Sequence, residues 1–178
     1  MKFLVVEGTV REGRKSIHAA RHVTELLDRE HDAELFDPAD RDIPHLGNRR
    51  YKDEESPTPE DIEEFGEKVE DTDGIVIVSP EYNHSYPGAL KNLLDYLYPE
   101  YEDKPFSYVT VSGGGFGGVR VLEDLESLTV TLGGIPGPSI PVSNIGDIFS
   151  GEGELVDEEY EQRFQDFVEE VVEHARKS

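Results

Sequence analysis

The sequence predicts an α/β fold in which helices cover both faces of a five-stranded parallel sheet. Short apolar runs typical of buried parallel strands alternate about five times with longer segments whose apolar residues recur at helical spacing. The 178 residues suit one compact domain, 1–178, with no internal repeat. In such a three-layer α/β/α fold, ligands bind at the carboxyl ends of the strands.

Five segments are expected to form the strands. Three of them are apolar runs, and the other two end at or follow chain-breaking residues such as Asp37-Pro38 and the stretch from Gly133 to Pro138. In chain order they are Phe3–Val6, Ala33–Phe36, Gly74–Val78, Ser107–Val111 and Ser139–Val142. The doubly wound arrangement of such units gives the sheet order 2-1-3-4-5.

Five helices are expected between and after these strands. The first carries an apolar stripe that includes Ile17, Ala20 and Val23, and Ser16 is its expected N-cap. The helices are Ser16–Arg29, Pro59–Glu70, Tyr86–Tyr98, Gly118–Leu132 and Val156–Arg176. The polar stretch from Pro38 to Thr58 exceeds the usual length of a connection, so it is either a functional flap or a mobile segment.

The composition limits which partners this chain can bind and which chemistry its side chains can carry out. Asp and Glu number 40 against 17 Lys and Arg, a net charge of −23 spread along the chain, which excludes nucleic acid and anionic membranes as partners. This charge distribution favours the interpretation that the protein is adapted to high salt over the alternative of an ordinary acidic protein. There is no cysteine, so electron chemistry would need a bound cofactor. No apolar run reaches the length of a membrane span, and the apolar N-terminus is typical of a strand, so a cytoplasmic location is expected.

The loop after the first strand has the composition of an anion site. Residues 8–16, GTVREGRKS, combine the hydroxyls of Thr9 and Ser16 with the cations Arg11 and Arg14 in an otherwise acidic chain. Together with free N–H groups at the helix start, these side chains predict a site for a dianionic phosphate. The loop has neither the Walker spacing nor the dinucleotide spacing of glycines. A plain turn with exposed arginines is the alternative.

Two further loops follow the third and fourth strands. The first contains Tyr82, whose ring could line a flat heterocycle; the second, SGGGFGGVR at residues 112–120, can bring backbone N–H groups against a ring edge. Taken alone, the glycine loop could equally hold no ligand. Because strands one, three and four are neighbours in the predicted sheet, the three loops should converge on one cleft. A phosphate site, a ring platform and a ring edge together match the shape of FMN.

These motifs resemble the NADPH-dependent FMN reductase family, which includes azo and quinone reductases and has a flavodoxin-like fold. Residues 80–92, PEYNHSYPGALKN, match the family's most specific motif, and residues 8–16 match its phosphate loop. The resemblance covers roughly Lys2 to Gly134, with Ser112 standing where Tyr is common. It implies that the phosphate is held by Thr9, Arg11, Arg14, Ser16 and Ile17. It further implies that the ring contacts Pro80, Glu81, Tyr82, Asn83, Ser112, Gly113, Gly114 and Gly115.

The resemblance also implies a reaction. Hydride would pass from NADPH or NADH to N5 of FMN and then to a small-molecule acceptor such as a quinone, an azo compound, a metal oxyanion or free flavin. The flavin would carry this chemistry, so we expect no catalytic side chain. The N–H groups of Gly113 to Gly115 would stabilise the anionic reduced ring, and the backbone of Glu81, rather than its carboxylate, would contact the flavin.

Relatives of this family form homodimers or homotetramers, so His84, Tyr86 and residues 49–52 are expected to face a partner chain. His18 and His22 lie four residues apart on the first helix, but without a third ligand a solvated pair is favoured over a metal site. Tyr96, Tyr98 and Tyr101 are expected in the core or in a dimer contact. Two other functions stay open: a flavodoxin-type FMN carrier without nicotinamide turnover, and a flavin-free module that binds another anion.

Overall fold

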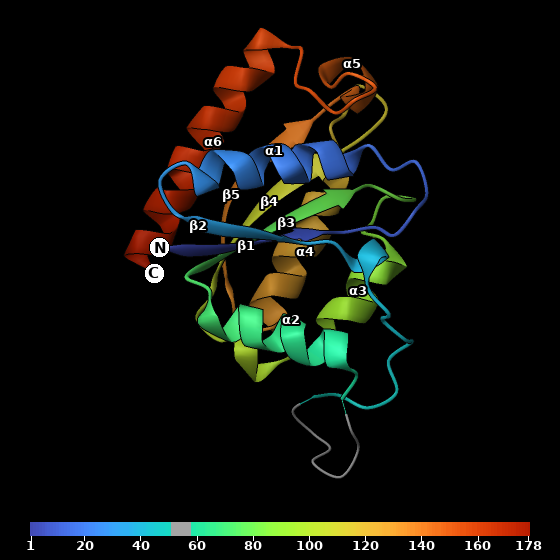
Figure 1. Cartoon of the computed structure of the whole chain (residues 1–178), viewed down its shortest axis with the longest axis vertical. Helices are drawn as coiled ribbons and strands as arrows, with labels where there is room; N and C mark the ends of the chain where they lie inside the picture. Colours follow the sequence, from blue (N-terminus) through green and yellow to red (C-terminus); the bar gives the residue numbers. More distant parts are fainter. Residues whose placement is uncertain (51–57) are drawn as a thin grey trace.

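Figure 1 shows the computed structural model of the chain, which describes residues 1–50 and 58–178. Five parallel strands pair in the order β2-β1-β3-β4-β5, which confirms the predicted sheet and its order. The strands are β1 Lys2–Glu7, β2 Asp32–Phe36, β3 Gly74–Pro80, β4 Pro105–Val111 and β5 Ile135–Val142.

Helices cover both faces of the sheet, as predicted (Figure 1). Side chains alternate along β1, so Phe3 and Val5 pack with one helical layer while Leu4 and Val6 pack with the other. One layer contains α1 Ser16–Asp28, α5 Ile145–Ile148 and α6 Glu158–Lys177; the other contains α2 Glu60–Asp71, α3 Gly88–Leu94 and α4 Val119–Thr131. The three-layer flavodoxin-like architecture follows.

Several predicted element boundaries are wrong. The fifth strand begins at Ile135 rather than Ser139, although Pro136, Pro138 and Pro141 lie inside it. Because β5 is an edge strand, a proline without an N–H group is tolerated there. The helix expected over Tyr86–Tyr98 extends only over Gly88–Leu94 and is followed by a short 3-10 helix, Pro99–Tyr101. Tyr96 and Tyr101 are buried in the core, as expected.

The described part of the 38–58 stretch is bound to the helical layer beneath it. After a short 3-10 helix, Pro38–Asp40, the N–H of Leu46 donates to Oδ1 of Asn92 (2.9 Å), and Nδ2 of Asn92 donates to the carbonyl of Pro44 (2.8 Å). The guanidinium of Arg50, a residue expected to face a partner chain, pairs with Glu63, Glu70 and Glu100 of its own chain. Tyr51 and Lys52 lie outside the described residues.

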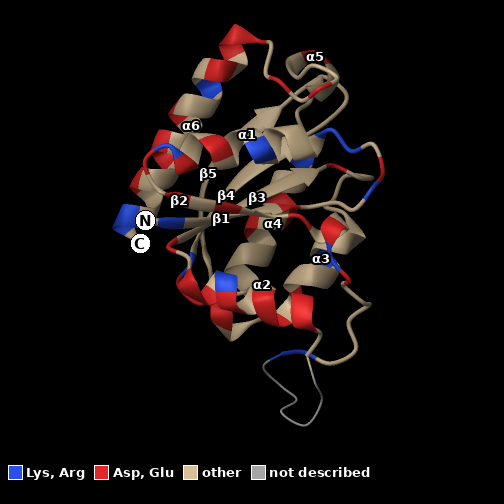
Figure 2. Cartoon of the chain, in the orientation of Figure 1, with Lys and Arg blue, Asp and Glu red and all other residues tan. Residues whose placement is uncertain are grey.

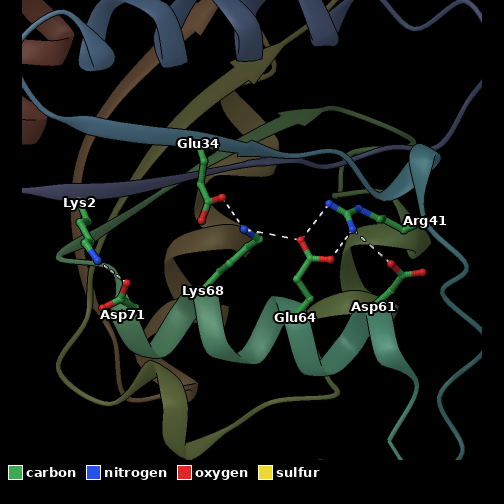
Figure 3. Close-up of polar contacts among 7 residues, drawn as sticks. All are labelled: Lys2, Glu34, Arg41, Asp61, Glu64, Lys68 and Asp71. Atoms are coloured by element: carbon green, nitrogen blue, oxygen red, sulfur yellow. Dashed lines mark hydrogen bonds and ion pairs between the residues drawn. The ribbon is translucent and has the colours of Figure 1, made fainter.

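Acidic residues are spread over both helical layers, most visibly on α2 and α6 (Figure 2). Along α2, acids pair with Lys2 and Arg41 from other segments, and Lys68 of α2 itself pairs with Glu34 on β2 (Figure 3). The ion pairs are Arg41 with Asp61 and Glu64, Lys68 with Glu34 and Glu64, and Lys2 with Asp71. Such exposed pairs each contribute about 1 kcal/mol or less. They link β1, β2 and the segment after β2 to α2 without balancing the net charge of −23.

Candidate functional site

The three predicted loops meet in one cleft at the carboxyl ends of β1, β3 and β4. The cleft has a volume of about 340 Å³. Its walls are Arg11, Gly13, Arg14, Lys15, Ser16, Pro80, Glu81, Tyr82, Val111, Ser112, Gly113 and Ile145. Five residues predicted for the site are not among its walls: Thr9, Ile17, Asn83, Gly114 and Gly115.

The first loop leaves the sheet through Gly8, which packs directly against β3. The N–H of Gly8 donates to the carbonyl of Val78 (2.7 Å), and a Cβ on Gly8 would lie 2.8 Å from that oxygen. Any side chain there would push β1 and β3 apart. The loop then turns at Gly13, whose φ of +68° is in the left-handed region that glycine tolerates. These two glycines set the path of the loop toward α1.

The start of α1 presents unpaired backbone donors. The N–H groups of Lys15, Ser16 and Ile17 donate to no acceptor within residues 1–50 and 58–178. Free N–H groups at a helix N-terminus attract anions, because each carries a partial positive charge and needs an acceptor. Ile17 therefore brings its N–H, rather than its buried side chain, to this end of the helix.

Arg14 is held beside these donors by Asp37, which follows β2. Nη2 of Arg14 pairs with Oδ2 of Asp37, and their side chains are only 17% and 8% exposed. The Nε of Arg14 is buried and has no hydrogen-bond partner in the described part of the chain. The guanidinium is thus oriented at the cleft wall with a donor still free, whereas Arg11 is exposed.

Thr9 links the first loop to the second. Its hydroxyl is buried and lies 3.1 Å from the phenol oxygen of Tyr82, and it accepts the N–H of Arg11 (3.3 Å). Both hydrogen bonds direct the Thr9 hydroxyl into the protein. Its structural role is therefore to orient Tyr82, which does line the cleft.

The second loop turns tightly after Tyr82. The N–H of Tyr82 donates to the carbonyl of Ser85 (2.8 Å), and the N–H of Ser85 donates to the carbonyl of Tyr82 (3.1 Å). Asn83 and His84 form the turn between them, with φ of 52° and 70°. Two successive positive φ values are typical of a primed two-residue turn, at which Asn is favoured. Asn83 therefore lies at the tip of a turn and not in the cleft wall.

Glu81 connects the second loop to the third. Its N–H donates to the carbonyl of Val111 (3.1 Å), so a backbone contact of Glu81 with a ligand would have to come from its carbonyl oxygen. The pairing extends the hydrogen bonding of β3 and β4 beyond the register of the two strands. The carboxylate lies 3.6 Å from Nη1 of Arg120, and its Oε2 is buried with no partner among the described residues.

The glycine loop leaves open space where side chains would stand. A Cβ on Gly113, Gly114 or Gly115 would meet no atom within 4 Å. The carbonyl of Gly114 accepts hydrogen bonds from the hydroxyl of Ser112 (2.7 Å) and the N–H of Asn144 (3.0 Å). The N–H groups of all three glycines donate to nothing in the described ranges. A flat group could therefore approach this backbone closely and find donors there.

Several residues of the site were missing from the predicted set; besides Gly13 and Val111, they are Lys15, Ile145 and Glu7. Lys15 and Ile145 line the cleft, the latter on α5, where the N–H of Ile145 donates to the carbonyl of Ser112 (3.1 Å). Behind the first loop lies Glu7, which is fully buried and accepts a hydrogen bond from the hydroxyl of Ser16 (2.6 Å). Ser16 is consequently not the N-cap of α1; Lys15 occupies that position. The sequence did contain a signal for Glu7, which is a charged residue directly after the apolar run Phe3–Val6.

Of the two histidines expected to form a solvated pair on α1, His22 is largely buried, with a side chain 13% exposed. The ring of His22 lies 5.1 Å from that of Phe164 at 70°, and its Nε2 is 3.6 Å from a carboxylate oxygen of Glu161. Burial lowers the pKa of His22, so the neutral ring is favoured in this apolar contact. Across residues 1–50 and 58–178, no three His, Cys, Asp or Glu side chains are grouped so as to hold a metal ion.

No described helix combines the length and the apolarity needed to cross a membrane.

Comparisons with known proteins agree on one family. The model of the family described as NADPH-dependent FMN reductase matches residues 1–146. An NADPH azoreductase of Bacillus sp. strain OY1-2 is 32% identical over 158 residues, which are 87% of this chain and 82% of that protein. An NAD(P)H-dependent FMN reductase of Schizosaccharomyces pombe is 35% identical over 150 residues, or 79% and 71% of the two chains.

Among solved structures, the flavoenzyme NAD(P)H:(acceptor) oxidoreductase FerB of Paracoccus denitrificans superimposes with a TM-score of 0.81. The match covers 99% of this chain and 97% of that one at 24% identity, and it supports the fold.

Proposed function

The chain belongs to the NADPH-dependent FMN reductase family, an FMN-dependent oxidoreductase family with a reduced nicotinamide as co-substrate, and on this premise we propose that its cleft binds FMN. The proposal rests on one observation: unpaired N–H donors and glycine backbone not covered by side chains lie in loops that form the same cleft. The free N–H groups at the start of α1 and the uncovered backbone of Gly113 to Gly115 both belong to loops that form the cleft. These features fit a phosphate joined to a flat ring.

The phosphate end is assigned to the first loop. Arg11 and Arg14 supply positive charge, and the N–H groups of Ser16 and Ile17 supply donors, in a chain whose net charge of −23 otherwise repels anions. Thr9 contributes by holding Tyr82 through their hydroxyl contact. This division of roles modifies the resemblance-based assignment of Thr9 as a direct ligand.

The ring end is assigned to the second and third loops. Pro80, Glu81 and Tyr82 form one wall, with Asn83 in the turn that follows, and Ser112 and Gly113 form the other, with Gly114 and Gly115 next to it in the same loop. When bound, FMN accepts hydride from the nicotinamide at N5 and passes it on. The chain orients the ring, and the glycine N–H groups stabilise negative charge on it. No side chain needs to act as acid or base.

The acceptor is proposed to be a small oxidised molecule, such as a quinone, an azo compound, a metal oxyanion or free flavin. Two of the relatives are named for azo and FMN reduction. Alternating hydride transfer into and out of one cofactor requires only that donor and acceptor reach the same ring face in turn.

An absorption spectrum tests the function directly. The purified protein, supplied with FMN and freed of excess, should retain a flavin spectrum, and anaerobic NADPH or NADH should bleach it within the mixing time. Retention of FMN without bleaching by either nicotinamide would indicate an electron carrier of the flavodoxin type. Failure to retain FMN at any KCl concentration would indicate a flavin-free module and contradict the proposal.

We further propose that the acidic surface is an adaptation to high salt. Acids on α2 and α6 repel one another in the folded state, and multimolar KCl shortens the screening length to about 3 Å. Thermal unfolding should therefore show a Tm that increases from 0.1 to 2 M KCl. Each kcal/mol of relieved repulsion raises Tm by roughly 2–4 °C in a chain of this size. Equal Tm values at both concentrations would contradict this adaptation.

Three other properties are proposed for the assembly, the domain organisation and the location of the chain. A homodimer or homotetramer is supported by Phe116 and Val119, which are 68% and 44% exposed next to the glycine loop, and a monomer in sedimentation equilibrium would contradict it. A single domain, 1–178, predicts one cooperative unfolding transition. A cytoplasmic location predicts recovery in the cytosolic fraction of the source cells.

A further inference from the structure

A glutamate is buried directly behind the proposed phosphate site. Glu7 is the last residue of β1 and is 0% exposed, on the face of the sheet that α1 covers. Its neighbour in the register of β3 is Val78, which is apolar. A carboxylate in such a position is unfavourable unless it is paired or protonated.

The partners of this carboxyl are few. Within the described residues, the hydroxyl of Ser16 donates to Oε1 (2.6 Å), while Oε2 has no hydrogen-bond partner. The charged groups that face it are Arg14, from the loop before α1, and Asp37, from the segment after β2, and these two pair with each other. The elements packed on Glu7 therefore supply no cation that is paired directly with the Glu7 carboxylate.

Burial raises the pKa of Glu7 to about 8. This value is a net result: Asp37 adds to the increase in pKa, whereas the Ser16 hydroxyl, Arg14 and the backbone N–H of Thr9 oppose it. An additional anion nearby would raise the pKa again, because it disfavours the carboxylate.

The direction of the Ser16 hydroxyl matters for the site. Ser16 lines the cleft, yet a hydroxyl has one hydrogen, and with an ionised Glu7 that hydrogen points inward. The Ser16 oxygen would then present only lone pairs to an anion in the cleft. A protonated Glu7 reverses the arrangement, since its O–H can donate to the Ser16 oxygen and release the serine hydrogen toward the cleft.

We propose that Glu7 and Ser16 form a hydrogen-bonded relay behind the phosphate loop, in which the Ser16 hydrogen turns toward the cleft when Glu7 is protonated, so that binding of FMN takes up one proton onto Glu7 in alkaline solution. The inference rests on the proposed FMN site and assigns Glu7 as a positioning residue. One O–H bond forms, between a solvent proton and Glu7, and the Ser16 hydroxyl rotates without changing its own bonds. No group is oxidised or reduced.

Calorimetric titration with FMN tests the relay. Titrations in two buffers of different ionisation enthalpy, at pH 7, 8 and 9 and constant KCl, give the number of protons taken up. The wild type should take up nearly none at pH 7 and close to one at pH 9, with Kd increasing up to tenfold per pH unit above 8. The FMN phosphate, with a second pKa near 6, is already a dianion over this range.

Two variants complete the test. Glu7→Gln keeps the size of the side chain but cannot ionise, so its proton uptake should stay near zero and its Kd should be flat from pH 7 to 9. Glu67→Gln, on the exposed face of α2, should behave as the wild type.

Tight FMN binding to the wild type without proton uptake at pH 9, or with equal uptake in Glu7→Gln, would overturn the relay and leave the proposed function standing. Absence of FMN binding already at pH 7 would overturn both.

Discussion

Replacing Arg14 with alanine is expected to weaken FMN binding by about 10- to 100-fold. A charge-assisted hydrogen bond contributes about 1.5–3 kcal/mol, and 1.4 kcal/mol corresponds to a factor of ten in Kd. The substitution also leaves Asp37, only 8% exposed, as an unpaired carboxylate beside the proposed phosphate site. Both effects act against a dianion. Titration of the flavin fluorescence with the apoprotein at pH 7 measures the change.

A double variant separates the two effects. Arg14→Ala combined with Asp37→Asn removes the unpaired carboxylate, so it should bind FMN more tightly than Arg14→Ala but less tightly than the wild type. Arg21→Ala, which removes an exposed cation of α1 outside the cleft, is the matched control and should leave Kd unchanged. An unchanged Kd in Arg14→Ala would show that the phosphate is not held by this loop.

The Glu7→Gln variant of the apoprotein is expected to be more stable than the wild type, by an amount that grows with pH. The folded state raises the pKa of Glu7 from 4.5 to about 8, so between these values the folded chain keeps a proton that the unfolded chain has released. The free energy of unfolding of the wild type therefore falls as pH rises, by about 1.4 kcal/mol per pH unit for this group. Glutamine has no such dependence.

Urea unfolding of both apoproteins at pH 5, 6, 7 and 8, at constant KCl, measures this difference. Subtracting one series from the other cancels the groups that titrate equally in both proteins, and the stability difference should grow by about 4 kcal/mol from pH 5 to 8. Glu67→Gln controls for the loss of one surface charge. A pH-independent difference would mean that Glu7 is ionised in the folded state without cost.

Together these expectations describe a site in which ionisation of Glu7 lowers the stability of the folded apoprotein and also weakens the binding of FMN. A buried carboxyl that destabilises the folded apoprotein at alkaline pH would be favoured in its neutral form once a dianion occupies the adjacent loop. The same pair of residues would then couple the occupancy of the cleft to the pH of the medium.

The sequence by itself determined the sheet and the location of the cleft. Apolar runs and helical spacing are local properties, so they predicted five strands, their order and the convergence of three loops. The cations of the first loop and the glycines of the third were visible because they depart from the composition around them. The family resemblance added the cofactor and the reaction.

Only the tertiary structure decided which groups in those loops remain free to bind. Thr9 is committed to Tyr82, 73 positions away, and the N–H of Glu81 is committed to Val111. The hydroxyl of Ser16 is turned toward Glu7. Such commitments depend on how segments distant in the chain pack, because a polar group buried by that packing must find a partner wherever one lies. Local patterns of residues do not contain that information.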